Sequence, residues 1–176
     1  GRLVVAISGP PATGKSTFSE TLLAALTNGH SNRLTACIVP MDGFHLDNSQ
    51  LDRLGLRARK GAPATFDFDG FHSLLERIRA TRRLVYYPVF DRARDLAVAG
   101  AGVVLPETQV VMLTVSEDDA NLLEATKAGA QGYLLKSLTA DQFLEMLNGL
   151  RQGKAAMTRQ TTARLMKGFS AVSSQR

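Results

Sequence analysis

The residues best suited to chemistry lie in the segment GPPATGKST, residues 9–17. Its spacing, G-x-x-x-x-G-K-S, is that of a phosphate-binding loop (P-loop), in which glycines let the backbone N–H groups surround phosphate oxygens. Lys15 would reach the β- and γ-phosphates of a nucleotide, most simply ATP, and the Ser16 hydroxyl would bind Mg²⁺. Lys15 is therefore also a candidate catalytic residue. The predicted phosphate contacts are Gly9, Ala12, Thr13, Gly14, Lys15, Ser16 and Thr17.

This loop requires a strand before it and a helix after it, and the sequence predicts both. Residues 3–8, LVVAIS, form a short apolar run that is typical of a parallel strand covered on both faces. A helix is expected over residues 15–26, and the positive end of its dipole would favour a bound phosphate. The competing interpretation is an ordinary glycine turn, which leaves a lysine followed by a hydroxyl unexplained.

A second candidate group, Asp42, follows another apolar run, LTACIVP at residues 34–40. In open α/β sheets, ligands gather at the carboxyl ends of the strands. Because the phosphate loop and Asp42 each follow a predicted strand, we expect them at the same edge of the sheet. A carboxylate there can accept a hydroxyl proton or bind Mg²⁺ through water. The alternative is a solvent-exposed aspartate that caps a turn.

The rest of the chain predicts strands that alternate with helices. Residues 43–70 are expected to be irregular, and a loop of that length is usually functional. The other expected elements are a helix over 71–81, strands or ribbon segments over 84–87 and within 89–104, strands over 109–115 and 132–136, and helices over 117–128, 139–152 and 155–169. The alternation predicts an α/β fold, a three-layer open sheet that is mainly parallel, with helices on both faces.

Length and composition limit the class of protein. With 176 residues, 44% apolar and 21% charged, the chain fits a single globular domain, and we expect a frayed tail at 170–176. The one cysteine, Cys37, excludes a disulfide framework and a cysteine-based zinc site, and it fits a cytoplasmic location. No apolar stretch approaches the roughly 20 residues of a membrane span, and no signal-peptide pattern is present.

The net charge of +5 suits a phosphorylated small molecule as a partner. Nucleic acid is the weaker interpretation, because the sequence has neither a helix-turn-helix signature nor a basic stripe interleaved with aromatic residues. The expected partner is therefore a nucleotide or inorganic phosphate, or sulfate in its place. The sequence predicts no oligomeric state.

Four motifs accompany the phosphate loop in order: VPMDGFH at 39–45, RKGAP at 59–63, TFDFD at 65–69 and YPVFDRARD at 87–95. With them, residues 2 to about 104 resemble bacterial small-molecule kinases related to uridine kinase and pantothenate kinase, especially those described as sugar or nucleoside kinases. The resemblance implies ATP-dependent phosphorylation of a hydroxyl group. It implies that Asp42 activates the acceptor and that His45, Lys60, Tyr87 and Arg92 contact the substrate. For His45, packing on Phe44 is an equally good interpretation.

The second half carries other motifs, VVMLTVSEDD at 110–119 and ATKAGAQGYLLK at 125–136. They make residues from about 107 to 169 resemble the end of a response-regulator receiver domain, which has a flavodoxin-like fold. In that resemblance Thr114 matches the switch hydroxyl and Lys136 the phosphate-contacting lysine. The acidic pair, the phospho-accepting strand and the output domain of a receiver are missing. The kinase-like half also lacks a recognisable arginine-bearing lid, and the acidic residues 117–119 are better explained as helix N-terminal charge.

The favoured hypothesis is a chimera, engineered rather than natural, that joins a kinase-like segment, 1–105, to a receiver-like βαβα segment, 106–169. It would bind nucleotide or phosphate with little or no catalysis, because phosphoryl transfer depends on positioning and charge stabilisation. The first alternative is a working small-molecule kinase. The second is a regulatory module with a receiver-like switch, and the missing phospho-acceptor strand counts against it.

The order of the strands is left open by these two resemblances. In the kinases the first strand lies between the two strands that follow the ribbon, whereas in a receiver the equivalent two strands are direct neighbours. If the last strand lies beside the first, Lys136 and Lys15 would flank one anion at the carboxyl edge of the sheet. The competing interpretation is that Lys136 reaches solvent or pairs with residues 117–119.

Overall fold

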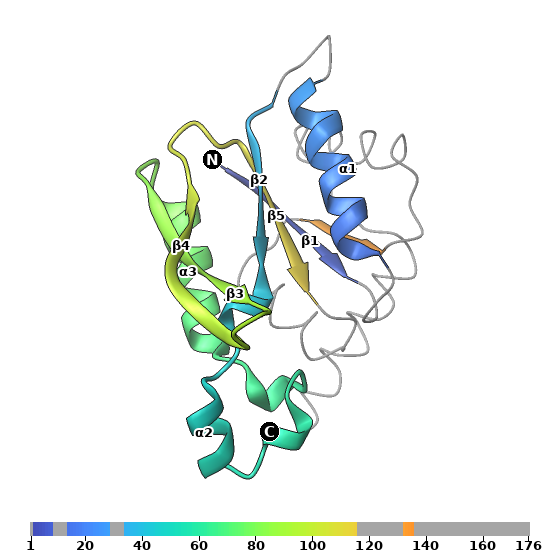
Figure 1. The fold of residues 1–176 in the computed structure, drawn as a ribbon. Coiled ribbons are helices and arrows are strands. Elements are labelled where there is room, and N and C mark those ends of the chain that lie inside the picture. Colours follow the sequence, from blue (N-terminus) through green and yellow to red (C-terminus); the bar gives the residue numbers. More distant parts are fainter. Residues whose placement is uncertain (1, 9–13, 29–33, 116–131, 136–176) are drawn as a thin grey trace, which may run out of the picture.

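Four parallel strands form the central sheet in the part of the chain that the structure describes. The computed structural model describes residues 2–8, 14–28, 34–115 and 132–135 (Figure 1). The strands are β1 (Leu3–Ser8), β2 (Ala36–Pro40), β5 (Val110–Val115) and β6 (Gly132–Leu135). They lie in the order β2-β5-β1-β6, and every pair is parallel. The predicted parallel α/β sheet is confirmed.

The strand order answers the question that the sequence leaves open. The first strand, β1, pairs with β5 on one side and with β6 on the other, so that Ser8 lies opposite both Val115 and Leu135. The two strands after the ribbon therefore flank β1 and do not pair with each other, which is the arrangement that the kinase resemblance implies. The helices predicted over 117–128, 139–152 and 155–169, the predicted frayed tail 170–176 and Lys136 lie outside the described residues. The receiver-like resemblance of 106–169 stays a prediction.

Helices cover both faces of the sheet, as predicted for a three-layer fold (Figure 1). On one face, Leu22 and Leu26 of α1 (Lys15–Asn28) pack with Val5, Ile7 and Met112. On the other face, α3 (Phe68–Ala80) packs four buried side chains against alternate strand residues; the four are Phe71, Leu74, Leu75 and Ile78. Alternate residues of the strands thus enter two different cores, which explains why the strands are apolar throughout.

The helix predicted over 71–81 begins three residues earlier, at Phe68. The reason is a cap: the side chain of Asp67 accepts a hydrogen bond of 2.9 Å from the backbone N–H of Gly70. An aspartate that accepts from N–H groups in the first turn stabilises the start of a helix. A Cβ at position 70 would overlap the carboxylate of Asp67, so glycine allows this cap to form.

The segment predicted to be irregular, 43–70, contains short helices, and this part of the prediction is wrong. They are η1 (Met41–Phe44), α2 (Asn48–Arg53), η2 (Arg57–Arg59) and η3 (Pro63–Thr65). Caps and turns of a few residues carry no apolar periodicity, so the pattern of the sequence does not reveal them. Asp47 shows the local cause: its side chain caps α2 by accepting a hydrogen bond from the backbone of Ser49. The segment lies beyond the carboxyl ends of the strands (Figure 1).

A separate antiparallel ribbon contains β3 (Val85–Asp91) and β4 (Leu96–Val104). The register is irregular between Tyr87 and Val89, where Pro88 has no N–H to donate. The turn ends at Asp95, whose φ of 55° is in the left-handed region. One face of the ribbon packs through Val85, Tyr87 and Val104 into the core beside α3. The ribbon thereby holds its tip near the end of β2.

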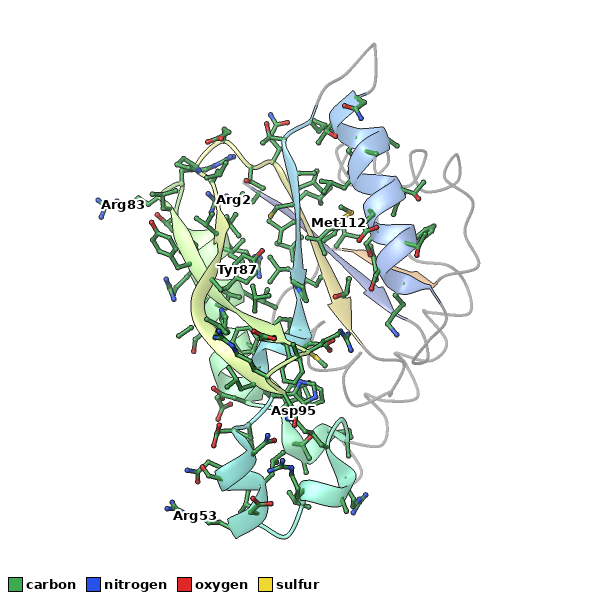
Figure 2. All side chains as sticks on the ribbon, viewed as in Figure 1. Arg2, Arg53, Arg83, Tyr87, Asp95 and Met112 are labelled. Carbon is green, nitrogen blue, oxygen red and sulfur yellow. The ribbon has the colours of Figure 1, made fainter. Side chains whose placement is uncertain are left out.

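Arg2 is buried near the amino ends of the strands, with 4% of its surface exposed (Figure 2). Its guanidinium donates hydrogen bonds to backbone carbonyl oxygens from α3, the turn before β3 and the β4–β5 connection: Ile78, Thr81, Arg83, Leu105, Pro106 and Thr108. Burial, and then the nearby charge of Arg82, lower the pKa of Arg2 below its usual value. Arg2 therefore joins the ribbon and α3 to the sheet.

No helix in the described parts of the chain is both long enough and apolar enough to cross a lipid bilayer.

Candidate active site

A cavity of about 400 Å³ lies at the carboxyl end of the sheet. Four of the side chains predicted from the sequence line it, and they come from α1, η1 and the ribbon: Ser16, Asp42, Tyr87 and Arg92. The other lining residues in the described part of the chain are Ser19, Glu20, Ile38, Pro40, Val89, Phe90 and Thr114. His45 and Lys60 are not part of this lining. The fold therefore brings the start of α1, the end of β2 and the tip of the ribbon around one space.

The start of α1 has the features that a phosphate site requires. Gly14 has a φ of 79°, which favours glycine, and α1 begins at the next residue. The first turn of α1 contains no acidic residue, so the positive end of the helix dipole has no fixed negative charge within that turn. Lys15 is half-buried, Ser16 and Thr17 are exposed, and Ser16 borders the cavity. These residues fit a nucleotide phosphate with Mg²⁺. Gly9, Ala12 and Thr13 lie outside the described residues.

Asp42 lies in the tight turn η1, directly after β2. Its carboxylate pairs with Arg92 from the tip of the ribbon, with 3.0 Å between Oδ2 and Nη2. The side chain of Arg92 is 81% exposed and that of Asp42 is 43% exposed, so solvent or a ligand can reach the pair. A solvent-exposed ion pair is weak and is readily exchanged for contacts with a ligand. Asp42 can therefore face a bound molecule without leaving its turn.

His45 supports the turn that carries Asp42. Its backbone N–H donates to the carbonyl oxygen of Asp42 at 3.2 Å, and its Nδ1 lies 2.8 Å from the same oxygen. The imidazole ring packs between Phe66 and Phe90, at centroid distances of 4.1 and 4.9 Å. The structure thus places His45 next to Phe90, a residue of the cavity lining, and on two aromatic rings other than Phe44.

Lys60 joins the short-helix segment to the turn of the ribbon. Its Nζ lies 2.7 Å from both Asp95 Oδ1 and Asn48 Oδ1, and 5.0 Å from the centre of the Phe90 ring. The hydrogen bond from Lys60, and then the one that the side-chain amide of Asn48 donates to Asp95 Oδ2, lower the pKa of Asp95 below its usual value. Figure 2 shows Asp95 where the ribbon meets this segment. Phe90 itself lines the cavity, so Lys60 contacts a residue of the lining without being part of it.

Tyr87 lines the cavity, and its hydroxyl is hydrogen-bonded to the backbone of β2. The phenol donates a hydrogen bond of 3.0 Å to the carbonyl oxygen of Ile38, and burial followed by the nearby Cys37 raises the pKa of Tyr87. A Cβ at Gly102, across the ribbon, would overlap this ring. Burial also raises the pKa of the Cys37 thiol to about 11, so the thiol stays protonated and unreactive near neutral pH.

Sequence reasoning missed several residues of the cavity, Glu20 and Phe90 above all. A signal for Glu20 exists: it follows Ser16 by four positions in α1, and residues at that spacing share one face of a helix. Phe90 has no such signal, because only the pairing of β3 with β4 turns it toward the cavity. Thr114, noted in the sequence for its match to a receiver, lies at the end of β5 and lines the same cavity.

Replacing Gly43 with alanine is expected to disturb both the fold and the site. A Cβ at this position would overlap the carbonyl oxygen of Pro88, a backbone atom that can move only if β3 moves. We expect the free energy of unfolding to fall by about 1–3 kcal/mol, because the turn after Asp42 must separate from the ribbon. Urea unfolding measures the change. A variant as stable as the wild type would show that this close approach is absent in solution.

No protein-family model matches the chain. A provisionally named uridine kinase of Schizosaccharomyces pombe is 38% identical over 97 residues, which are 52% of this chain and 41% of that protein. The pantothenate kinase of Coxiella burnetii is 31% identical over 112 residues, 62% of this chain and 34% of that protein. This chain therefore matches less than half the length of either curated relative.

Solved structures extend the similarity over most of the chain. The crystal structure of a provisionally named fructose transport system kinase from Silicibacter sp. is 38% identical with a TM-score of 0.69, covering 94% of this chain and 80% of that one. A possible uridine kinase from Bacillus stearothermophilus has a TM-score of 0.61 at 15% identity, covering 89% and 88%, and supports the fold alone.

These relatives correct the favoured hypothesis from the sequence. The three relatives that are more than 30% identical are named as kinases, and the match to the Silicibacter structure continues well beyond residue 105, since it covers 94% of the chain. A kinase explains this better than an engineered chimera with little or no catalysis, and nothing in these matches supports engineering. The strand order points the same way, because β1 lies between β5 and β6.

Proposed function

The chain belongs to the P-loop kinases, and from this premise we propose that it transfers the γ-phosphoryl group of ATP to a hydroxyl group of a small molecule. The observation that carries the proposal is that Ser16, Asp42 and Arg92, from three separate elements, line one cavity beside the start of α1. Catalysis of phosphoryl transfer consists mainly of positioning and charge stabilisation. A cavity with a phosphate site at one wall and a carboxylate at another supplies both.

At the phosphate side, Lys15 and the first N–H groups of α1 would orient the β- and γ-phosphates, and the Ser16 hydroxyl would bind Mg²⁺. When bound, Mg²⁺ neutralises charge on the phosphates. Lys136 stays a predicted phosphate contact; the strand that precedes it, β6, pairs with β1, as that prediction requires. The predictions of a cytoplasmic location and of no nucleic-acid partner are likewise untested.

At the acceptor side, Asp42 would take the proton from the attacking hydroxyl group. Arg92 would hold this carboxylate in place until the acceptor enters, since the two are paired at 3.0 Å. Ile38, Val89 and Phe90 give the cavity apolar walls that limit the entry of water. His45 and Lys60, which the sequence proposed as substrate contacts, would instead hold the Asp42 turn and Phe90 in position. The acceptor classes that the resemblance suggests are sugars, nucleosides and pantothenate-like molecules.

The direct test is ATP-dependent ADP release with a panel of sugars, nucleosides and pantothenate. Turnover with at least one acceptor, in the usual range of about 1–100 s⁻¹, would support the proposal. Binding of ATP without turnover of any acceptor would contradict it and would return the hypothesis of a phosphate-binding protein without catalysis.

Replacing Lys15 with alanine is expected to weaken ATP binding at least tenfold, which corresponds to about 1.4 kcal/mol. The reason is the loss of the ammonium group that would contact the phosphates at the start of α1. Isothermal titration calorimetry measures the affinity. Arg53→Ala is the control, because Arg53 is an exposed cation on α2 and does not line the cavity. Equal affinities of wild type and Lys15→Ala would contradict the assignment of the phosphate site.

A further inference from the structure

Two of the charged side chains that line the cavity form an ion pair, and a third has no partner in the described part of the chain. Among the described residues that line it, Glu20, Asp42 and Arg92 carry a charge. Asp42 and Arg92 neutralise each other, with 3.0 Å between carboxylate and guanidinium. The carboxylate of Glu20 forms no hydrogen bond or ion pair with any residue in the described part of the chain. The wall therefore carries one negative charge that no cation of that part balances.

Glu20 lines the same cavity as Asp42 because of its place in α1. It follows Ser16 by one turn of the helix, on the same face, and both residues line the cavity. Ile38 and Phe90 belong to the same lining. A molecule that brings a hydroxyl group to Asp42 thus occupies a space of about 400 Å³ with Glu20 in its wall.

We propose that Glu20 makes this site select uncharged, hydroxyl-rich acceptors, that is sugars or nucleosides, against acceptors that carry a carboxylate. The proposal rests on the proposed kinase function and names its substrate class. An ionised carboxylate accepts hydrogen bonds only, so it binds the O–H groups of a sugar or ribose well. It repels an anion: like charges about 4 Å apart change an equilibrium constant about fivefold even at the dielectric constant of water.

Arg92 does not cancel this selection. An anionic acceptor that binds Arg92 has to share this guanidinium with Asp42, with which it is paired. The described lining then still holds two carboxylates, those of Glu20 and Asp42, against one guanidinium, so the balance of charge stays unfavourable to an anion. An uncharged acceptor adds no negative charge to this space.

The test compares two uncharged acceptors, D-fructose and uridine, with two anionic acceptors, pantothenate and D-glycerate. We expect the wild type to have a higher kcat/KM, measured by ADP release, for an uncharged acceptor. Glu20→Gln, which keeps the shape and removes the charge, is expected to raise the ratio of anionic to uncharged kcat/KM about fivefold, and Glu20→Lys to raise it further. High salt should narrow the difference between wild type and Glu20→Gln, because the charge is screened.

Glu76→Gln is the matched control. Glu76 is an exposed carboxylate on α3, and none of the cavity's lining residues comes from α3. The Glu76→Gln variant loses one negative charge, as Glu20→Gln does, but away from the cavity. The ratio of anionic to uncharged kcat/KM is therefore expected to stay at the wild-type value.

Each failure has its own signature. The inference is overturned, while the kinase activity stands, by either of two results. One is a wild type that prefers an anionic acceptor, and the other is a Glu20→Gln variant with an unchanged ratio of anionic to uncharged kcat/KM. If the wild type phosphorylates no acceptor, the proposed function fails. Calorimetry with ATP present then measures the affinities for the anionic and the uncharged acceptors, and the change in their ratio on Glu20→Gln decides the role of Glu20.

Discussion

Replacing Asp42 with asparagine is expected to lower kcat by about 10²–10⁴-fold, the usual contribution of a positioned general base. Asparagine has nearly the same size as aspartate and still offers an oxygen to Arg92, which in the wild type pairs with the carboxylate at 3.0 Å. It cannot take a proton from a hydroxyl group. The η1 turn should persist, because His45 contacts the backbone carbonyl of Asp42, not its side chain. ADP release with a saturating acceptor measures kcat.

Calorimetry with ATP separates a loss of catalysis from a loss of binding. Because Asp42 follows β2 whereas the phosphate site lies at the start of α1, we expect the affinity for ATP to change little. Asp69→Asn, at an exposed carboxylate in the first turn of α3, is the matched control and should keep the wild-type kcat. A kcat of Asp42→Asn within tenfold of the wild-type value would mean that another group takes the proton.

Replacing Arg2 with methionine is expected to lower the free energy of unfolding by about 4 kcal/mol. Methionine fills much of the same space but donates no hydrogen bond, so the carbonyl oxygens that Arg2 now contacts lose their donor. Each buried polar group left without a partner costs about 1–3 kcal/mol, and water can reach some of these oxygens. The loss should appear as a lower midpoint in urea unfolding.

Two further variants show whether hydrogen bonding by Arg2 is the cause. Arg2→Lys keeps the charge but brings three donors at one point instead of a planar fork, so we expect an intermediate stability. Arg83→Met removes an exposed arginine whose carbonyl, but not side chain, contacts Arg2, and it should leave stability unchanged. Equal stabilities of wild type and Arg2→Met would mean that the ribbon and α3 hold to the sheet without this guanidinium.

The sequence by itself determined the elements that depend on neighbouring residues. The strand at the apolar run 3–8 and the helix from Lys15 onward follow from spacing and hydrophobic pattern within fewer than 30 residues. The same holds for β2, for β5 and for the alternation that predicts a parallel α/β sheet. Asp42 could be proposed because parallel strands bring their carboxyl ends to one edge. Each of these inferences needs only local patterns and one general rule.

Only the tertiary structure decided the order of the strands, which agrees with the arrangement that the kinase resemblance implies. Two local resemblances implied incompatible orders, and strand pairing joins residues such as Ser8 and Val115 that are far apart in the sequence. The same applies to the site: Arg92 meets Asp42 across 50 positions, and Lys60 meets Asp95 across 35. Such contacts depend on how a ribbon, a helix and a sheet pack together. Hydrophobic burial determines how these elements pack. The sequence around each residue does not reveal which distant residue the packing will bring into contact with it.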